Sequence, residues 1–113
     1  MALQTTLRIQ PHSDTAVLTL RGVLDAYSAR DARRAILRLR EVPVRRVVLD
    51  LTALAFIDTI GAGALVHVVE PDGTFDPVVT IVARTHQVIA MLRVVGLGEP
   101  TTLVLTSEDP VSA

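Results

Sequence analysis

The chain has 113 residues, half of them apolar, with 11 arginines, no lysine, 12 acidic residues, no cysteine and a formal net charge of −1. This length fits one domain, and the missing residue types exclude disulfides, cysteine zinc sites, thiolate nucleophiles, P-loop lysines and Schiff-base chemistry. The near-neutral charge argues against an electrostatic footprint for nucleic acid or anionic lipid over the whole molecule.

The chain is expected to be cytoplasmic, without contact with a membrane. Its first residues, Met-Ala-Leu-Gln, contain neither the basic n-region nor the apolar h-region of a signal peptide. No apolar run approaches the ~18 residues that a transmembrane helix needs. The high aliphatic content does allow a homodimer through an apolar patch.

A β-hairpin is predicted at the start of the chain. Residues 3–10 alternate between apolar and polar side chains, residues 11–14 are of turn-forming types, and residues 16–21 alternate again. Alternation with a period of two is typical of strands with one buried face. The two segments are therefore expected to pair as neighbours joined by the turn.

Residues 27–40 are predicted to form an amphipathic helix. Alanine, isoleucine and leucine recur on one helical face, and arginines occupy the opposite face. Ser28 and Asp31 fit a capping pair at the helix start, with Asp25 as the alternative cap. Pro43 ends the pattern.

The rest of the chain alternates between predicted strands and helices. Three short apolar runs predict strands: residues 47–51, 78–84 and 101–106. Between them, one helix opens at Gly61 and ends early at residues 71–73, which contain proline and glycine. The next helix is capped by Thr85 and ends at Gly96. Residues 107–113 are expected to form a frayed tail.

This order, β-β-α-β-α-β-α-β, predicts an α/β fold. Strands separated by helices need crossover connections, which favour parallel neighbours joined with right-handed geometry. We therefore expect a mixed β-sheet with helices packed on it. Residues 1–113 are expected to form a single domain, because no linker, repeat or low-complexity segment divides the chain.

Motifs for metal binding or catalysis are weak in this sequence. The histidines at positions 12, 67 and 86 match no metal-ligand spacing, so neither a metal site nor a cofactor is expected. There is no G-x-S-x-G elbow, and Gly61-Ala62-Gly63 is too short a match to G-x-G-x-x-G. Hydrolase and dehydrogenase functions are both disfavoured.

Seven of the eleven arginines lie within residues 30–46. The simplest interpretation is a solvated helix face, because Asp31 and Glu41 are interspersed among them. The alternative is a docking stripe for an acidic partner. Nucleic acid is a weaker candidate, because no aromatic residue is expected near enough to stack on bases.

Asp58 and Thr59 lie at the predicted mouth of the second helix. A threonine at a helix N-cap bonds a free backbone N–H, which alone explains its presence. The functional alternative is a phosphate on Thr59, stabilised by free N–H groups and the helix dipole. Nearby glycines would let a partner approach the backbone. Asp58, and Asp25 if the strands bring it near, would supply negative charge or ligate a partner's Mg²⁺.

Two motifs resemble the STAS family, the domain of bacterial anti-sigma-factor antagonists and of the cytoplasmic ends of sulfate transporters. Residues 21–25, RGVLD, resemble the family's G-E-L-D. Residues 47–66, VVLDLTALAFIDTIGAGALV, resemble its hydrophobic strand, D-L-S/T, F-[ILM]-D-S-S-G-L-G and helix. Residues 85–97 are similar to its S-P-x-V…L-x-x-x-G-L stretch. The resemblance covers nearly the whole chain and implies the family's fold, whose element order is the one predicted above.

The resemblance implies a non-catalytic regulatory module, an anti-sigma-factor antagonist. In such proteins, an anti-sigma factor that is also a GHKL-type kinase binds the unphosphorylated antagonist. It releases the antagonist once the hydroxyl after the motif's aspartate is phosphorylated. In this chain that hydroxyl belongs to Thr59. The same motifs imply a set of partner-binding residues: Asp25, Asp58, Ile60, Gly61, Ala62 and Gly63.

Several residues depart from the family's pattern. Thr59 replaces the usual serine, Ile60 the second serine or threonine, Ala62 the leucine of G-L-G, and Val23 the glutamate of G-E-L-D. A β-branched acceptor is stiffer, so a serine-preferring kinase is expected to phosphorylate it poorly. Threonine does resemble the acceptors of stressosome-type STAS proteins. Residues 70–77 contain prolines and a glycine, so we expect a shortened second helix and an irregular loop.

Two alternatives remain open beside the phosphorylation switch. A constitutive STAS scaffold, as a subunit of a transporter or stressosome-like assembly, would use the same helix surface unmodified, and apolar Ile60 suits an interface core. A small-ligand or nucleotide binder would use the N-terminus of the second helix as an anion site. The missing lysine and the incomplete glycine-rich loop argue against this last alternative.

Overall fold

The computed structural model describes residues 2–69, 77–99 and 101–106. In chain order the elements are β1 (Gln4–Gln10), the 3-10 turn η1 (Pro11–Ser13), β2 (Thr15–Leu24), α1 (Ala29–Leu39), β3 (Arg46–Ile57), α2 (Thr59–Leu65), the 3-10 turn η2 (Val66–Val69), β4 (Val78–Ala83), α3 (His86–Val94) and β5 (Thr102–Leu105). This succession confirms the predicted α/β fold with its β-β-α-β-α-β-α-β order.

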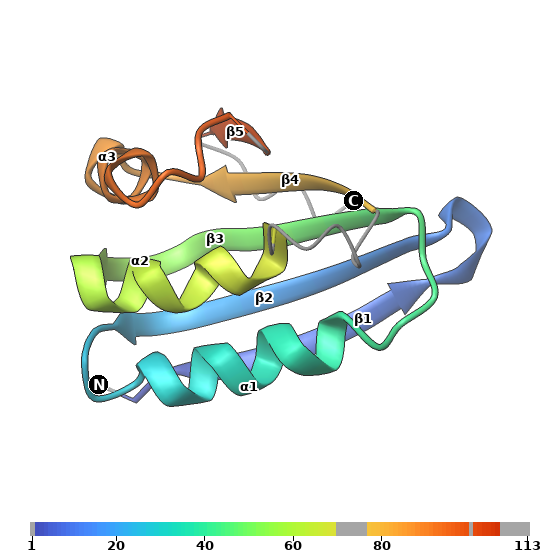
Figure 1. Ribbon diagram of the computed structural model, residues 1–113, viewed down its shortest axis with the longest axis horizontal. Coiled ribbons are helices and arrows are strands. Elements are labelled where there is room, and N and C mark those ends of the chain that lie inside the picture. Colours follow the sequence, from blue (N-terminus) through green and yellow to red (C-terminus); the bar gives the residue numbers. More distant parts are fainter. Residues whose placement is uncertain (1, 70–76, 100, 107–113) are drawn as a thin grey trace.

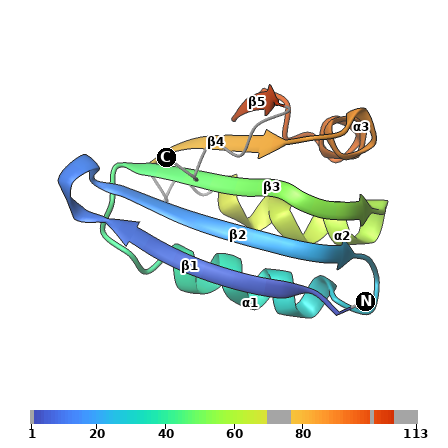
Figure 2. The same cartoon turned by 180° about the vertical axis from the view of Figure 1, so that it is seen from behind.

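The strands lie in the sheet in their sequence order, β1-β2-β3-β4-β5. β1 is antiparallel to β2, and every other neighbouring pair is parallel. Successive right-handed crossovers that move in one direction across a sheet put their helices on the same side. Accordingly, α1 and α2 lie in front of the sheet in Figure 1 and behind it in Figure 2.

The hydrophobic core lies between this helical face and the sheet. α1 contributes the apolar face predicted from its sequence, with Ala32, Ile36 and Leu39 buried. Alternate residues of the central strands join the same cluster, because successive side chains of a strand point to opposite faces. Fully buried members from β2 and β3 include Leu18, Leu20, Leu49 and Leu51.

Strands β2 and β3 extend beyond their predicted ends at residues 21 and 51. The register of their pairing shifts twice, once on each side of residues 21–22, and Gly22 adopts a φ of 109° there. A positive φ is accessible to glycine without strain. The irregular stretch keeps the strands paired as far as Leu24 and Ile57. A bulge interrupts the alternation of apolar and polar side chains, so the sequence pattern predicts both strands to end too early.

The third helix begins and ends as predicted, whereas α2 begins at Thr59, two residues before the predicted Gly61. The Thr85 hydroxyl caps α3 by accepting from the N–H of Val88 at 3.3 Å, and Gly96 follows the helix with a φ of 88°. The second helix is short, because α2 ends at Leu65 and continues only as η2. The irregular loop predicted at residues 70–77, apart from Pro77, and the frayed tail predicted at residues 107–113 lie outside the described residues. No described helix has the length and apolar character to cross a bilayer.

Candidate functional site

The two motifs singled out in the sequence meet at one end of the sheet. Leu24, the last residue of β2, pairs with Ile57, the last residue of β3. The N–H of Asp58 also donates to the carbonyl of Leu24 at 3.1 Å. Asp25 and Asp58 therefore follow neighbouring strand ends. The strands thus bring Asp25 to the same end of the sheet as Asp58, as its predicted role requires.

Asp58, not Thr59, caps helix α2. Its Oδ1 accepts a hydrogen bond from the N–H of Gly61 at 2.7 Å. Thr59 is the first residue of the helix itself. The predicted capping role of Thr59 is wrong, because the carboxylate one residue earlier already takes the N–H that a cap serves. The Thr59 side chain is exposed, and no described residue forms a hydrogen bond with its hydroxyl.

The hydrogen bond from the N–H of Gly61 to Asp58 argues against the small-ligand alternative. An anion site at a helix N-terminus depends on free backbone N–H groups and an uncompensated positive dipole end. At α2 the Asp58 carboxylate occupies the N–H of Gly61 and compensates the dipole. A second anion at this position would meet a negative charge, so the geometry disfavours a nucleotide or phosphate ligand there.

Gly61 and Ala62 face the interior of the protein. Both are buried, and Ala62 has an exposed fraction of 0%. A Cβ on Gly61 would lie 2.7 Å from the carbonyl carbon of Leu24 and 2.8 Å from its Cγ. The close backbone approach expected of this glycine is thus made by β2 of the same chain. Accessible members of the predicted partner-binding set are Asp25, Asp58, Ile60 and Gly63.

Asp25 and Ser28 fasten the loop between β2 and α1. Asp25 Oδ1 accepts from the N–H groups of Tyr27, at 3.0 Å, and Ser28, at 3.2 Å. Ser28 Oγ accepts from the N–H of Asp25 at 3.0 Å and donates to the carbonyl of Val23 at 2.9 Å. The predicted Ser28–Asp31 capping pair is wrong, because the serine hydroxyl is committed to this loop. Asp25, the alternative cap, instead accepts hydrogen bonds from the free N–H groups ahead of α1.

Gln87 of α3 holds the end of β3, a role that the sequence analysis missed. The pairing of β3 with β4 stops at Leu51 and Ala83, so Ile57 has no strand on that side. Gln87 Nε2 donates to the carbonyl of Ile57 at 2.6 Å, and the N–H of Ile57 lies 3.4 Å from Oε1. The side-chain amide thus takes the place of the missing strand beside Asp58. No local pattern indicates a contact between residues 30 positions apart.

Replacing Gln87 with methionine is expected to lower the free energy of unfolding by about 1 to 2 kcal/mol, because the shape is kept while both hydrogen bonds are lost. Glutamine and methionine have similar helix propensities, so α3 itself should be unaffected. Urea denaturation measures the loss, and amide hydrogen exchange at Ile57 should speed up. The exposed neighbour His86, replaced with methionine, is the matched control. Equal stability of the two variants would show that the hydrogen bonds between Gln87 and Ile57 do not stabilise the fold.

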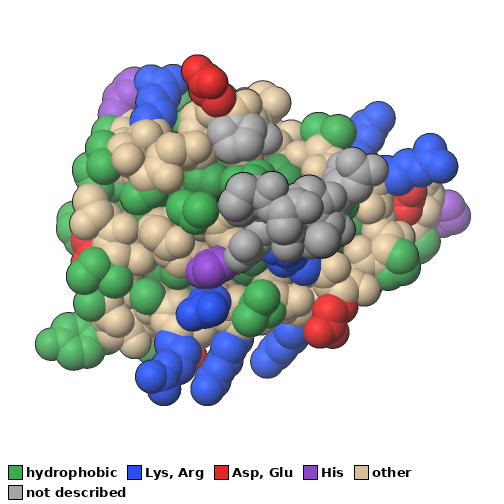
Figure 3. Space-filling model, viewed as in Figure 1, with side chains coloured by type: hydrophobic (Ala, Val, Ile, Leu, Met, Phe, Trp, Pro, Cys, Tyr) green, Lys and Arg blue, Asp and Glu red, His purple; other side chains and the backbone are tan. Residues whose placement is uncertain are grey.

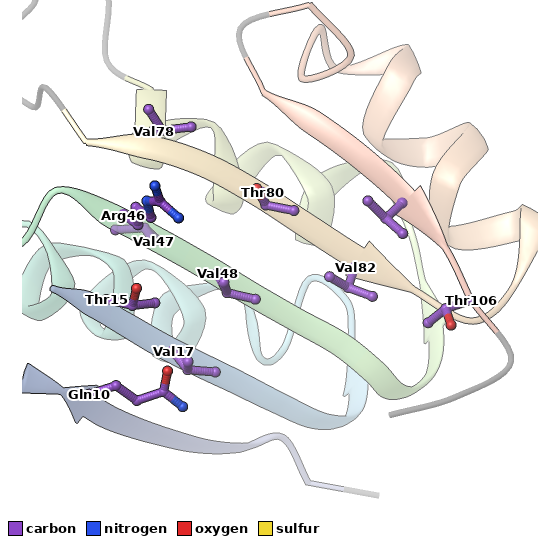
Figure 4. A pocket seen from close by; sticks show the side chains of 11 residues that line it. Gln10, Thr15, Val17, Arg46, Val47, Val48, Val78, Thr80, Val82 and Thr106 are labelled. Carbon is purple, nitrogen blue, oxygen red and sulfur yellow. The ribbon is translucent and has the colours of Figure 1, made fainter. Parts of the chain in front are cut away.

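A separate cavity of about 570 Å³ lies on the sheet face that α1 and α2 leave uncovered. Figure 4 shows side chains of β2, β3 and β4 projecting from that face, among them Val17, Val48 and Val82. Its described lining has one charged side chain, Arg46, and several threonines. The cavity therefore offers no pair of acid and base groups. Among the described residues, no three His, Asp or Glu side chains gather where a metal ion could bind.

A family model of the STAS domain matches residues 6–109. No curated protein sequence matches the chain.

Three solved structures illustrate the likeness in fold. An anti-sigma factor antagonist from Mycobacterium paratuberculosis superposes with a TM-score of 0.79 at 22% identity, covering 96% of this chain and 90% of that one. The Bacillus cell fate determinant SpoIIAA in its phosphorylated form gives 0.62 at 18% identity, covering 89% and 91%. SLC26A9 gives 0.64 at 15% identity, covering 96% of this chain and 23% of that one.

Proposed function

The chain belongs to the STAS domain family, and from this premise we propose that it is an anti-sigma-factor antagonist whose binding is switched at Thr59. The unphosphorylated form binds an anti-sigma factor of the GHKL kinase type, and phosphorylation of Thr59 releases it. The domain itself catalyses no reaction. The observation that carries the proposal is the exposed Thr59 hydroxyl at the first position of α2, between Asp58 and Ile60.

The surroundings of Thr59 suit a hydroxyl that another protein phosphorylates. The backbone before it is held by the Asp58 cap and by Gln87, so the side chain is presented in a defined position. A kinase brings its own catalytic base, metal ions and ATP, so the acceptor protein needs only accessibility and the right backbone shape. The exposure of Thr59 supports the first requirement, accessibility. The hydrogen bonds on its N-terminal side support the second, a defined backbone shape.

Phosphorylation would change the charge of this surface more than its fold. A phosphate adds roughly 1.5 to 2 negative charges. It would join the carboxylates of Asp25 and Asp58, which follow neighbouring strand ends. A partner that fits the neutral hydroxyl would meet added bulk and like charge, or an unpaired phosphate buried in the interface. Release on phosphorylation is the expected consequence.

A constitutive scaffold is the second candidate function, favoured by Ile60. This apolar side chain is 59% exposed directly after the acceptor. Exposed apolar groups of this kind occupy the centres of protein interfaces. The likeness to one part of SLC26A9 is compatible with a permanent place in a larger assembly. In that case Thr59 would contact a partner without being modified.

Phosphorylation assays separate the two candidates. The chain is incubated with ATP and, singly, with each GHKL-type anti-sigma kinase of the same organism, and intact mass and site mapping follow. We expect one phosphate on Thr59, absent from Thr59→Ala and retained in Thr5→Ala, which alters an exposed threonine of β1. Binding without modification would favour the scaffold. Absence of both binding and modification with every kinase would exclude the antagonist function.

A further inference from the structure

Positive charge on this chain is concentrated in one stretch. Residues 28–46 contain seven arginines and two acidic residues, a formal charge of +5. The rest of the chain contains four arginines and ten acidic residues, a formal charge of −6. The near-neutral total therefore conceals a strong separation of charge, and it says little about any single face of the molecule.

Helix α1 turns this charge towards solvent. Arg30, Arg33, Arg34 and Arg38 are exposed on the side opposite its buried apolar face. Figure 3 shows basic side chains in a row along the lower edge of the molecule, over α1. Among the described residues, no carboxylate forms an ion pair with any of these four arginines. Arg40 differs, because its Nη1 donates to the carbonyl of His67 at 2.9 Å and so ties α1 to η2.

A groove between α1 and α2 runs beside this row. It has a volume of about 290 Å³ and a described lining of Ala29, Arg30, Arg33, Ile60, Gly63, Ala64 and His67. Small residues on both helices leave the space open, and a Cβ on Gly63 would meet no atom within 4 Å. The groove thus combines an arginine wall with an exposed apolar side chain, Ile60, next to the acceptor threonine.

Acidic and aromatic side chains lie at the α1 N-terminal end of the same surface. Asp25 precedes α1, and Asp58 caps α2. Tyr27, two residues before α1, is 96% exposed. The surface therefore carries both signs of charge together with two apolar anchors, Tyr27 and Ile60. A partner that binds this surface must complement both its charges and its exposed apolar side chains.

We propose that the four exposed arginines of α1 and the α1–α2 groove dock an acidic segment of the protein partner. This inference rests on the proposed function, since the partner is the anti-sigma factor. Carboxylates of the partner pair with Arg30, Arg33, Arg34 and Arg38, and an apolar side chain enters the groove against Ile60. A nucleic acid fits less well, because its uniform negative charge would be repelled by Asp25 and Asp58.

Charge reversal in matched positions tests the docking surface. Arg33→Glu, and the double variant Arg30→Glu/Arg33→Glu, alter the groove wall, while Arg21→Glu alters an exposed residue of β2 by the same charge per site. Binding of the unphosphorylated chain to each GHKL-type anti-sigma kinase is measured by biolayer interferometry at several salt concentrations, with circular dichroism to confirm folding. We expect Arg33→Glu to weaken binding about tenfold, mainly through slower association, and the double variant to weaken it further.

The control and the salt series decide the outcome. Arg21→Glu should change the affinity less than twofold, and the difference between variants should shrink at high salt, where surface charges are screened. Unchanged binding of the double variant, or equal losses in it and in the control, would overturn the proposal.

If the proposed function is wrong, the binding experiment gives a different result from the one expected if only the docking surface is wrong. If no kinase binds, antagonist function is excluded and the surface is probed with poly-L-glutamate and with duplex DNA. Capture of poly-L-glutamate that Arg30→Glu/Arg33→Glu abolishes would support an acidic protein partner. Stronger capture of DNA, or capture of neither probe, would overturn the inference.

Discussion

Replacing Gly61 with alanine is expected to lower the free energy of unfolding by about 3 kcal/mol, the upper range for overpacking in a core. The new methyl group would lie 2.7 Å from the Leu24 carbonyl carbon, well inside van der Waals contact. Because backbone atoms are the obstacle, no side-chain rotation relieves the overlap, and α2 must move away from β2. Urea denaturation of the purified variant measures the loss.

Gly63 provides the matched control for this prediction. It lies two positions later in α2, and a Cβ there would contact nothing within 4 Å. Gly63→Ala should therefore raise stability by up to about 1 kcal/mol, since alanine is the better helix former. The two substitutions are chemically identical and are predicted to act in opposite directions. Similar effects from both would show that the contact with Leu24 does not constrain α2.

The second large effect is expected from Thr59→Glu, which should weaken binding to the anti-sigma kinase by about 10- to 100-fold, or roughly 1.4 to 2.7 kcal/mol. A carboxylate at this position adds negative charge beside Asp58, as a phosphate would. It should not unfold the protein, because Thr59 is exposed and its side chain is not part of the core. Isothermal titration calorimetry with the unmodified chain as reference measures the change.

Two further variants separate charge from size in that experiment. Thr59→Gln has nearly the same shape as the glutamate variant without its charge, and Thr59→Ala removes the hydroxyl. The alanine variant should bind as the unmodified chain does, and the glutamine variant should lie between it and the glutamate variant. If Thr59→Glu binds as tightly as Thr59→Ala, negative charge at this position is not the switch.

Most of the fold could be predicted from sequence because its elements follow simple periodicities. The hairpin, the amphipathic α1, the Thr85 cap and the Gly96 terminus all depend on contacts within a few residues. The ends of β2 and β3 could not be predicted, because the bulge near Gly22 breaks the alternation while the backbone pairing continues to Leu24 and Ile57.

The candidate site was predicted less completely than the fold. The neighbourhood of Asp25 and Asp58 followed from the resemblance and from strand pairing, but three details depend on contacts between distant segments. Gln87 binds Ile57 across 30 positions, and Gly61 is shaped by Leu24. The choice of Asp58 over Thr59 as the cap depends on a one-residue difference in where α2 begins, and helix ends are the least predictable feature of an amphipathic pattern.

The contact between Gln87 and Ile57 has a consequence for how a kinase could identify its target. The shape around Thr59 is assembled from the end of β2, the start of α2 and one side chain of α3. No short stretch of the sequence contains all three. A linear peptide centred on Thr59 would lack the conformation that surrounds the hydroxyl in the folded chain. Selectivity for this acceptor would then be a property of a discontinuous epitope, unlike the consensus peptides that many other kinases accept.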